Sequence, residues 1–272
     1  MNKENYIKII NTKINNPNTR NIMIKQIDTY NKVSKEIIDN KKYSIGDRVF
    51  LKKGTLLHGT YKNIEGLQYI VENGLISSWF IDGRGSKYPS SVGVWNLTKD
   101  YYLDEYIDFY SGGTIRFREE NKEEYTQVIP YSNMKNIMDI IKEKDYFMWE
   151  IEQTKEARFM PNNLQDKVQI AIIFKNNKEL LKGDILEESN INDIDVKELV
   201  NDKYYEQFII DRKNKNDFFT NRESAILFGI PSNLIEGILV GKSYEKDPNI
   251  LKRIKELLPN AYICNLKGIV IY

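Results

Sequence analysis

The apolar run at residues 168–174 constrains the fold of this chain more than any other segment. It reads Val-Gln-Ile-Ala-Ile-Ile-Phe, a composition typical of a strand that is buried on both faces of a sheet. Shorter apolar segments, bounded by turn residues, predict further strands at 49–52, 93–98, 115–118, 128–129, 226–228, 235–240, 261–264 and 268–272. Short strands with few helices predict an α+β fold in which two small sheets face each other across a cleft.

Composition excludes several classes of protein. The 272 residues are 41% apolar and 29% charged, which is typical of a globular chain. No segment approaches the ~20 apolar residues that span a bilayer, and charged residues interrupt the N-terminal 13 residues, so we expect a cytoplasmic protein without a membrane partner. With Cys264 as the single cysteine and His58 as the single histidine, the sequence predicts no disulfide and no metal site.

Charge is distributed unevenly although the net charge is only +1. Residues 1–53 hold 12 Lys and Arg against 5 Asp and Glu, whereas residues 184–206 hold 8 acidic residues against 2 Lys. The basic segment could dock on phosphates, form a solvated helical face or neutralise the acidic segment of its own chain. We favour the internal contact, and we expect 184–206 to be an exposed helical part of an insertion at about 175–216.

The N-terminal 45 residues are predicted to be a helical extension of a catalytic domain that spans 46–272. Pro17 breaks the first helix, and Thr19 is a candidate N-cap for the second. Apolar residues with helical spacing form one stripe on that second helix, at Met23, Ile27, Tyr30, Val33 and Ile37. This stripe is expected to pack on the rest of the protein or on a partner. A further helix is predicted at 134–144.

His58 lies in the segment Lys-Gly-Thr-Leu-Leu-His-Gly-Thr at 53–60, which is typical of a strand that enters a tight turn. Because Gly59 has no Cβ, an imidazole nitrogen and a bare backbone could meet the same ligand there. A lone histidine is more often a satisfied surface or core group. A second segment, in which Glu223 stands at the start of an apolar strand, favours the functional interpretation.

The order of segments around these residues is informative. After His58 comes a predicted helix at 63–73 that ends at Gly74, then a strand with Trp95 at its centre, then an aromatic-rich helix at 99–106, and much later the strand with Glu223. This order resembles the ADP-ribosyltransferase fold. It looks closest to the branch with a His-Tyr-Glu triad, shared by diphtheria-like toxins and poly(ADP-ribose) polymerases. The resemblance covers roughly 50–110 and 218–272.

The resemblance implies a split two-sheet core around an NAD cleft. It also implies transfer of ADP-ribose from NAD to a macromolecular acceptor (protein, nucleic acid or the enzyme itself), without a metal. The catalytic residue would be Glu223, which would stabilise an oxocarbenium-like ribose and bind its 2′-OH. The implied cofactor-binding residues are His58 on the adenosine ribose, Gly59 on the nicotinamide amide, its neighbour Thr60, and Trp95 and Tyr106 around the nicotinamide.

Three positions depart from the family pattern. Trp95 replaces the triad tyrosine, Leu103 replaces a serine that binds the amide, and Asn221 stands where arginine- and asparagine-modifying toxins have Glu or Gln. Two other functions therefore stay open: a catalytically inactive module that binds NAD or ADP-ribose, and an RNA 2′-phosphotransferase on the same fold. The structural alternatives are a solubility role for Glu223 on an edge strand and ordinary core packing for Trp95.

Overall fold

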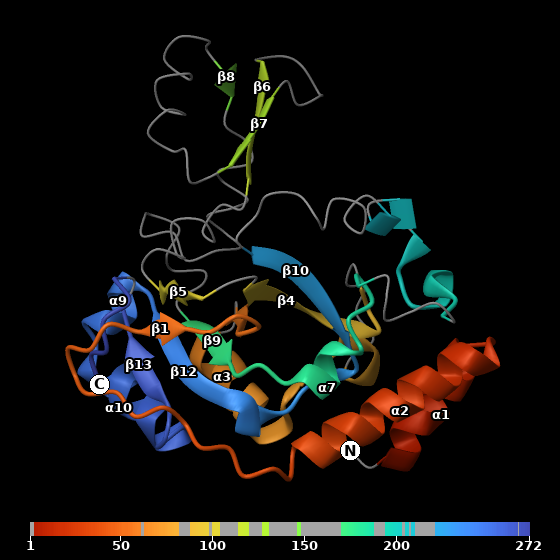
Figure 1. Ribbon diagram of the computed structural model, residues 1–272, viewed down its shortest axis with the longest axis horizontal. Helices are drawn as coiled ribbons and strands as arrows, with labels where there is room; N and C mark the ends of the chain where they lie inside the picture. The colour runs from red at the N-terminus through yellow and green to blue at the C-terminus, as the bar shows by residue number, and fades with distance from the viewer. Residues whose placement is uncertain are drawn as a thin grey trace.

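A mixed six-stranded sheet organises the protein in the computed structural model (Figure 1). Its strand order is β10-β4-β2-β9-β12-β13, and all neighbours are antiparallel except β12 and β13. The strands span Leu56–Thr60 (β2), Ser91–Leu97 (β4), Ile170–Phe174 (β9), Asn221–Leu227 (β10), Ile235–Val240 (β12) and Tyr262–Cys264 (β13). The structure describes residues 3–60, 63–81, 88–97, 100–103, 114–119, 127–130, 146–147, 170–187, 194–202, 205–206, 208–209, 221–265 and 267–272.

The central position of β9 confirms the prediction made from the apolar run at 168–174. All five of its side chains are buried, and β2 and β12 pair with its two edges. Alternate residues serve different faces: Ile172 belongs to one apolar cluster, and Ala171 and Ile173 belong to another. The continuous apolar sequence follows from this burial on both faces.

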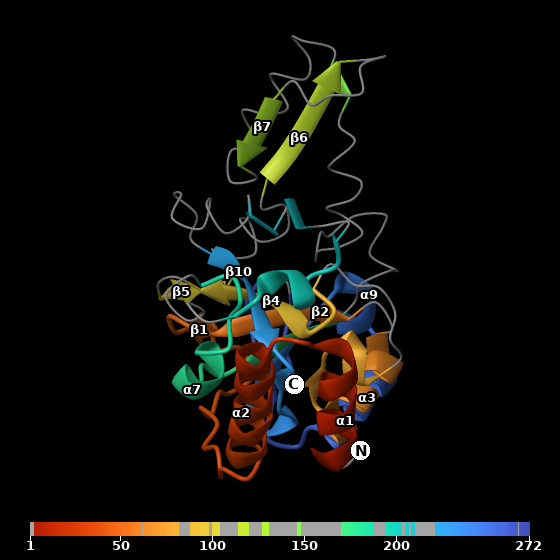
Figure 2. The same cartoon turned by 90° about the vertical axis from the view of Figure 1, so that its right-hand side faces the viewer.

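Two helices precede the sheet and lie side by side in Figure 2: α1 (Lys3–Lys13) and α2 (Pro17–Val33). The predicted N-cap, Thr19, is wrong. Asn16 caps α2 instead, because its side-chain oxygen accepts hydrogen bonds from the backbone N–H groups of Asn18 and Thr19 and Pro17 takes the first helical position. The predicted apolar stripe packs inward at Met23, Ile27 and Val33, which are buried. It is wrong at Ile37, which lies after the end of α2 and is 96% exposed.

The start of α2 contacts the acidic segment, as the favoured internal contact predicts, but the bonds come from backbone N–H groups and the Thr19 hydroxyl and not from the basic side chains on which the prediction rested. The Glu198 carboxylate accepts hydrogen bonds from the backbone N–H groups of Asn15 at 2.8 Å and Asn16 at 3.1 Å. The backbone N–H of Asp195 donates to the Thr19 hydroxyl at 2.9 Å. The contact therefore uses the partial positive charge of a helix N-terminus together with side-chain capping.

The expectation of an exposed helical segment at 184–206 is wrong for residues 184–187 and for most of 194–200, whereas 205–206 are helical. Asp184 forms a bridge with Ile226 of β10, and its carboxylate accepts the backbone N–H of Ala225 at 2.9 Å. Only a short 3₁₀ turn, η4 (Val196–Glu198), is helical in 194–200. Apolar residues scattered through the acidic run face the core, and these are Ile185, Leu186, Leu199 and Val200.

Helix α3 (Asn63–Asn73) ends as predicted, with Gly74 at a φ of +80°. The predicted helix at 99–106 is wrong where it is described, because Tyr101–Tyr102 forms strand β5 and pairs with β1 (Phe50–Leu51). The expected helix at 134–144 lies outside the described residues. The remaining elements are β3 (Leu75–Ile76), η1 (Ser78–Phe80), β6 (Thr114–Glu119), β7 (Gln127–Pro130), β8 (Tyr146–Phe147), α7 (Lys178–Leu181), β11 (Gly229–Ile230), η7 (Ser232–Leu234), α9 (Lys242–Glu245) and α10 (Pro248–Leu257).

Candidate functional site

The three strands that carry the candidate residues are neighbours in the sheet. Glu223 on β10 lies directly opposite Trp95 on β4, and Trp95 lies opposite Leu57 on β2. Directly opposite residues in an antiparallel pair project to the same face, so Glu223 and Trp95 share a face. Glu223 is not at the start of its strand, as the sequence suggested, because pairing already begins at Asn221.

Strands β2 and β4 separate beside His58. They pair only at Leu56 with Asn96 and at Leu57 with Trp95. On its other edge, β2 stays paired with β9 through Thr60. His58 therefore comes directly after the last residue that β2 pairs with β4, and Gly59 follows it.

The His58 ring crosses this gap. Its Nδ1 lies 3.0 Å from the backbone oxygen of Gly93 on β4. A carbonyl oxygen can only accept, so Nδ1 carries the hydrogen and Nε2 of the neutral ring is left as an acceptor. Burial lowers the pKa of His58 below its ordinary value, and the hydrogen bond to Gly93 opposes that shift. The neutral imidazole is thus favoured, with a lone pair on Nε2.

Gly93 lies between His58 and Glu223, which project from opposite faces of the sheet: His58 shares the face of Ile172, and Glu223 shares the face of Trp95. It is exposed in the middle of β4, between the buried residues Val92 and Val94. A Cβ on Gly93 would lie 3.6 Å from Oε1 of Glu223. The carbonyl of this glycine binds the imidazole, and its missing side chain leaves room beside the carboxylate.

The other candidate residues differ in their accessibility. Trp95, Gly59 and Glu223 are half-buried, and Trp95 packs partly against the apolar cluster that contains Leu57. Thr60 is only 7% exposed and pairs with β9. By strand alternation, the His58 side chain projects from the face of β2 opposite to the one on which a side chain at position 59 would lie. Tyr106 lies outside the described residues.

A polar pair that we did not predict from the sequence connects the same two strands from the other face of the sheet. The Asn96 amide donates to the Ser224 hydroxyl at 3.2 Å, and both side chains are buried. These residues follow Trp95 and Glu223 directly, so the bond holds β4 and β10 together behind them. Polar residues next to the candidates in otherwise apolar strands were the available signal, as was the glycine inside β4.

In the described part of the chain, no three His, Cys, Asp or Glu side chains form a group that could hold a metal ion. None of the described helices is long and apolar enough to cross a bilayer. Comparison with known proteins assigns no family: no family model, no curated protein and no solved structure matches the chain.

Proposed function

We propose that this protein is an NAD-dependent ADP-ribosyltransferase that moves ADP-ribose from NAD to a macromolecular acceptor and releases nicotinamide. The observation that carries the proposal is that His58 and Glu223 both lie next to Gly93, on the two faces of the sheet, where β2 and β4 separate. Trp95 stands beside Glu223 in the same register. The cleft of a split two-sheet core would then open at this gap.

The main requirement of the reaction is a carboxylate of fixed orientation in a site that is partly shielded from water. The bond between the ribose C1′ and the nicotinamide nitrogen breaks, and its electron pair leaves with neutral nicotinamide. The acceptor nucleophile then forms a bond to C1′ and loses its proton. A carboxylate at Glu223, half-buried on a paired strand, would stabilise the cationic sugar better than water because its orientation is fixed before the reaction.

The neighbouring groups suit the rest of the cofactor. A neutral His58 with a lone pair on Nε2 would accept a hydrogen bond from a ribose hydroxyl. The bare backbone of Gly59 could meet the nicotinamide amide, and the indole of Trp95 offers a flat apolar surface with one N–H donor. The replacement of the family's tyrosine by Trp95 keeps the stacking surface and moves the polar group.

The test is incubation of the full chain with labelled NAD, compared with Glu223→Gln. We expect label on the protein or on an added acceptor, and a rate about 10²- to 10³-fold lower in the variant, because an amide cannot balance the charge that develops on the sugar. NAD affinity should change little. The control is Glu4→Gln, an exposed glutamate on α1, which should transfer label at the normal rate.

Three outcomes would contradict the proposal. Full activity in Glu223→Gln would remove this residue from the mechanism. Binding of NAD without transfer by the unmodified protein would favour the inactive binding module. Removal of a 2′-phosphate from RNA, without incorporation of label, would favour the RNA 2′-phosphotransferase.

A further inference from the structure

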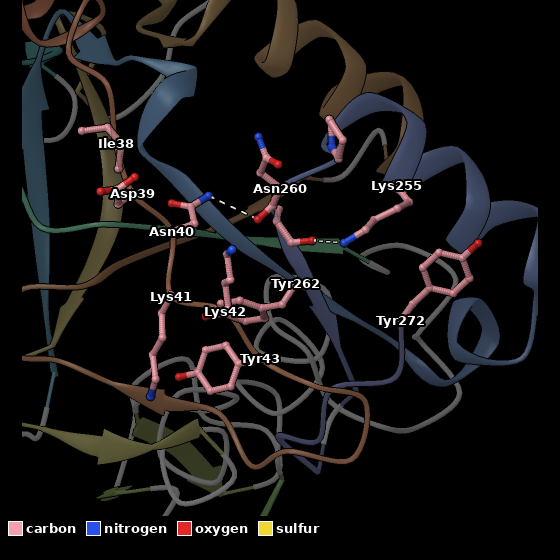
Figure 3. A pocket seen from close by; sticks show the side chains of 12 residues that line it. Ile38, Asp39, Asn40, Lys41, Lys42, Tyr43, Lys255, Asn260, Tyr262 and Tyr272 are labelled. Carbon is pink, nitrogen blue, oxygen red and sulfur yellow. Dashed lines mark hydrogen bonds between the residues drawn. The ribbon is translucent and has the colours of Figure 1, made fainter.

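A pocket of about 460 Å³ lies beside β13, at the opposite edge of the six-stranded sheet from Glu223 (Figure 3). Its walls come from the segment after α2, from the C-terminal end of α10 and from the start of β13. Its volume falls within the range of small-molecule sites. The polar residues that matter below are Asn40, Lys41, Lys42, Lys255 and Asn260.

The pocket lining has more positive than negative side chains. Three lysines line it against one carboxylate, that of the exposed Asp39. The Lys255 ammonium donates to the backbone oxygen of Ala261 at 2.8 Å, which holds it at the wall. In Figure 3 the Lys42 side chain points toward Asn40 and Asn260. This lining favours a ligand that carries negative charge.

Asn40 fixes the wall of the pocket. Its amide nitrogen donates to the backbone oxygens of Ile235 at 3.2 Å and Asn260 at 3.5 Å, which ties the segment after α2 to β12 and to the start of β13. Its Oδ1 is buried, so Asn40 shapes the pocket and offers the ligand no acceptor.

Strand β1 continues this surface outside the pocket. In β1 and the residues on either side of it, the buried Val49 and Leu51 alternate with Arg48, Phe50 and Lys52, which are exposed or half-buried. In a strand this alternation places the last three side chains on one outward face. Tyr102 of β5 pairs with Phe50 on that face and is 37% exposed.

Rings and cations alternate along this surface, and both groups are held in place. The Phe50 and Tyr102 rings have centroids 5.0 Å apart. The Arg48 guanidinium lies 3.8 Å from the Tyr102 ring, and the Lys52 ammonium lies 4.9 Å from the Phe50 ring. We call Lys41, Tyr43, Arg48, Phe50, Lys52 and Tyr102 the cation–aromatic stripe.

Tyr43 joins the stripe to the pocket. It lines the pocket, and the Lys41 ammonium lies 4.4 Å from its ring. Its hydroxyl donates to the backbone oxygen of Phe50 and accepts from the backbone N–H of Phe50, both at 3.1 Å. The ring is therefore fixed between the pocket and the outward face of β1.

We infer that the pocket and the cation–aromatic stripe together bind a single-stranded nucleic acid. Unpaired bases stack on aromatic rings and on guanidinium planes, while lysines contact the phosphates between them. A duplex has no exposed base faces for these rings, and an acidic peptide would use the cations alone. Besides Asp39 in the pocket, two acidic groups reduce the positive potential of this surface without reversing it. These are Asp100, which pairs with Lys52 at 3.0 Å, and the half-buried Glu236 near Lys41. The inference does not depend on ADP-ribose transfer.

The first test is fluorescence anisotropy of the full chain with labelled oligo-dT and oligo-rU of about 15 nucleotides at low salt. Binding of either strand supports the inference, and the tighter of the two identifies the source. Each lysine that contacts a phosphate should add about 0.7 to the slope of log K against log salt. The double variant Lys41→Gln/Lys42→Gln should therefore bind more weakly and with a shallower slope. The control Lys8→Gln/Lys25→Gln, on exposed positions of α1 and α2, should bind normally.

The second test isolates stacking from charge. Tyr102→Leu should weaken single-strand binding at least roughly fivefold, because base stacking on an aromatic ring contributes about 1–3 kcal/mol per base. Tyr102→Phe should bind normally, and so should Tyr69→Leu, which removes an exposed tyrosine of α3. Two results would overturn the inference: no binding of either oligonucleotide, or equal binding of a duplex with no effect of Tyr102→Leu.

Discussion

The two edges of strand β2 behave differently. Along one edge, β2 pairs with β9 from Leu56 to Thr60, and β9 in turn pairs along β12. Along the other edge, pairing with β4 stops after Leu57, and a histidine side chain makes the next connection. The closed edge is lined by fully buried apolar residues such as Ile172, whereas the open edge has an exposed glycine, Gly93.

The two edges of β2 therefore differ in role: the closed edge stabilises the fold, and the open edge carries the proposed site. At the closed edge each backbone group has a ladder partner and the side chains fill an apolar cluster. At the open edge, the backbone next to His58 and Gly59 is not paired with β4. Under the proposed function, the unpaired polar groups at the open edge are available to bind a ligand. The closed edge holds β2 in the sheet.

The largest effect is expected from a substitution at the closed edge. Ile172 lies between Ile238 of β12 and His58 of β2 and is 0% exposed. Ile172→Ala should lower the free energy of unfolding by about 2–5 kcal/mol, because the cavity cannot collapse fully. Urea denaturation measures this change. The same deletion at Ile45, which is 75% exposed, should cost less than about 0.5 kcal/mol, and equal losses would refute the comparison.

A smaller effect is expected from His58→Ala at the open edge. Loss of the Nε2 acceptor should weaken NAD binding by about 0.5–1.5 kcal/mol, or about 2- to 13-fold. The fold should survive, because Gly93 is exposed and water can bind its carbonyl. Calorimetry of His58→Asn provides the matched comparison, since the Asn amide can still donate to Gly93 but has no acceptor at the position of Nε2. Normal affinity in both variants would make His58 structural.

The pH at which His58 takes up a proton in the folded protein should be lower than for an ordinary histidine. Because burial holds the pKa of His58 below its ordinary value of about 6.5, the unfolded chain takes up this proton first as the pH falls. The contribution of His58 to stability is complete above that value and is lost as the pH drops toward the folded pKa. NAD affinity should likewise stay constant through about pH 6.5 and fall only below it. A decline centred at or above 6.5, or one that persists in His58→Ala, would contradict this assignment.

The smallest effect on stability is expected from Gly93→Ala. Alanine in a strand is more favourable than glycine by roughly 0.5–1 kcal/mol, and the added methyl would make an ordinary contact with Glu223 at 3.6 Å. Thermal unfolding should therefore show equal or slightly higher stability. Transfer of label from NAD should nevertheless slow, because the methyl occupies the space beside the carboxylate. A variant that is both destabilised and fully active would show that Gly93 serves only the fold.

The sequence predicted correctly those elements whose structure depends on residues within one segment. The apolar run of β9 and the glycine that ends α3 are decided by side chains within one segment. The helix predicted over Tyr101 and Tyr102 is wrong because their strand exists through pairing with β1: Tyr101 pairs with Leu51, 50 residues earlier, and Tyr102 with Phe50, 52 residues earlier. The acidic count of 184–206 likewise concealed the few apolar residues that decide its burial.

The candidate site was predictable in its residue types and not in its geometry. The positions of His58, Trp95 and Glu223 on three strands followed from their segments, but the separation of β2 from β4 depends on the register between strands. Register is a tertiary property that alternation within one strand cannot fix. For the same reason, Gly93 could not be recognised as the residue that lies next to both His58 and Glu223.

The attachment of α2 to Glu198 has a consequence for how the chain is made. The bonds that hold the start of α2 join residues 182 and 183 positions apart. At a synthesis rate of roughly 5–20 residues per second, the first helices leave the ribosome about 10–40 s before their partner exists. Throughout that time the apolar cluster of Ile10, Ile14, Met23 and Ile27 lacks its later members, which include Leu199, Val200, Phe208 and Phe228. We expect the nascent chain to bind chaperones through this stripe and to release them only when most of its length has been translated.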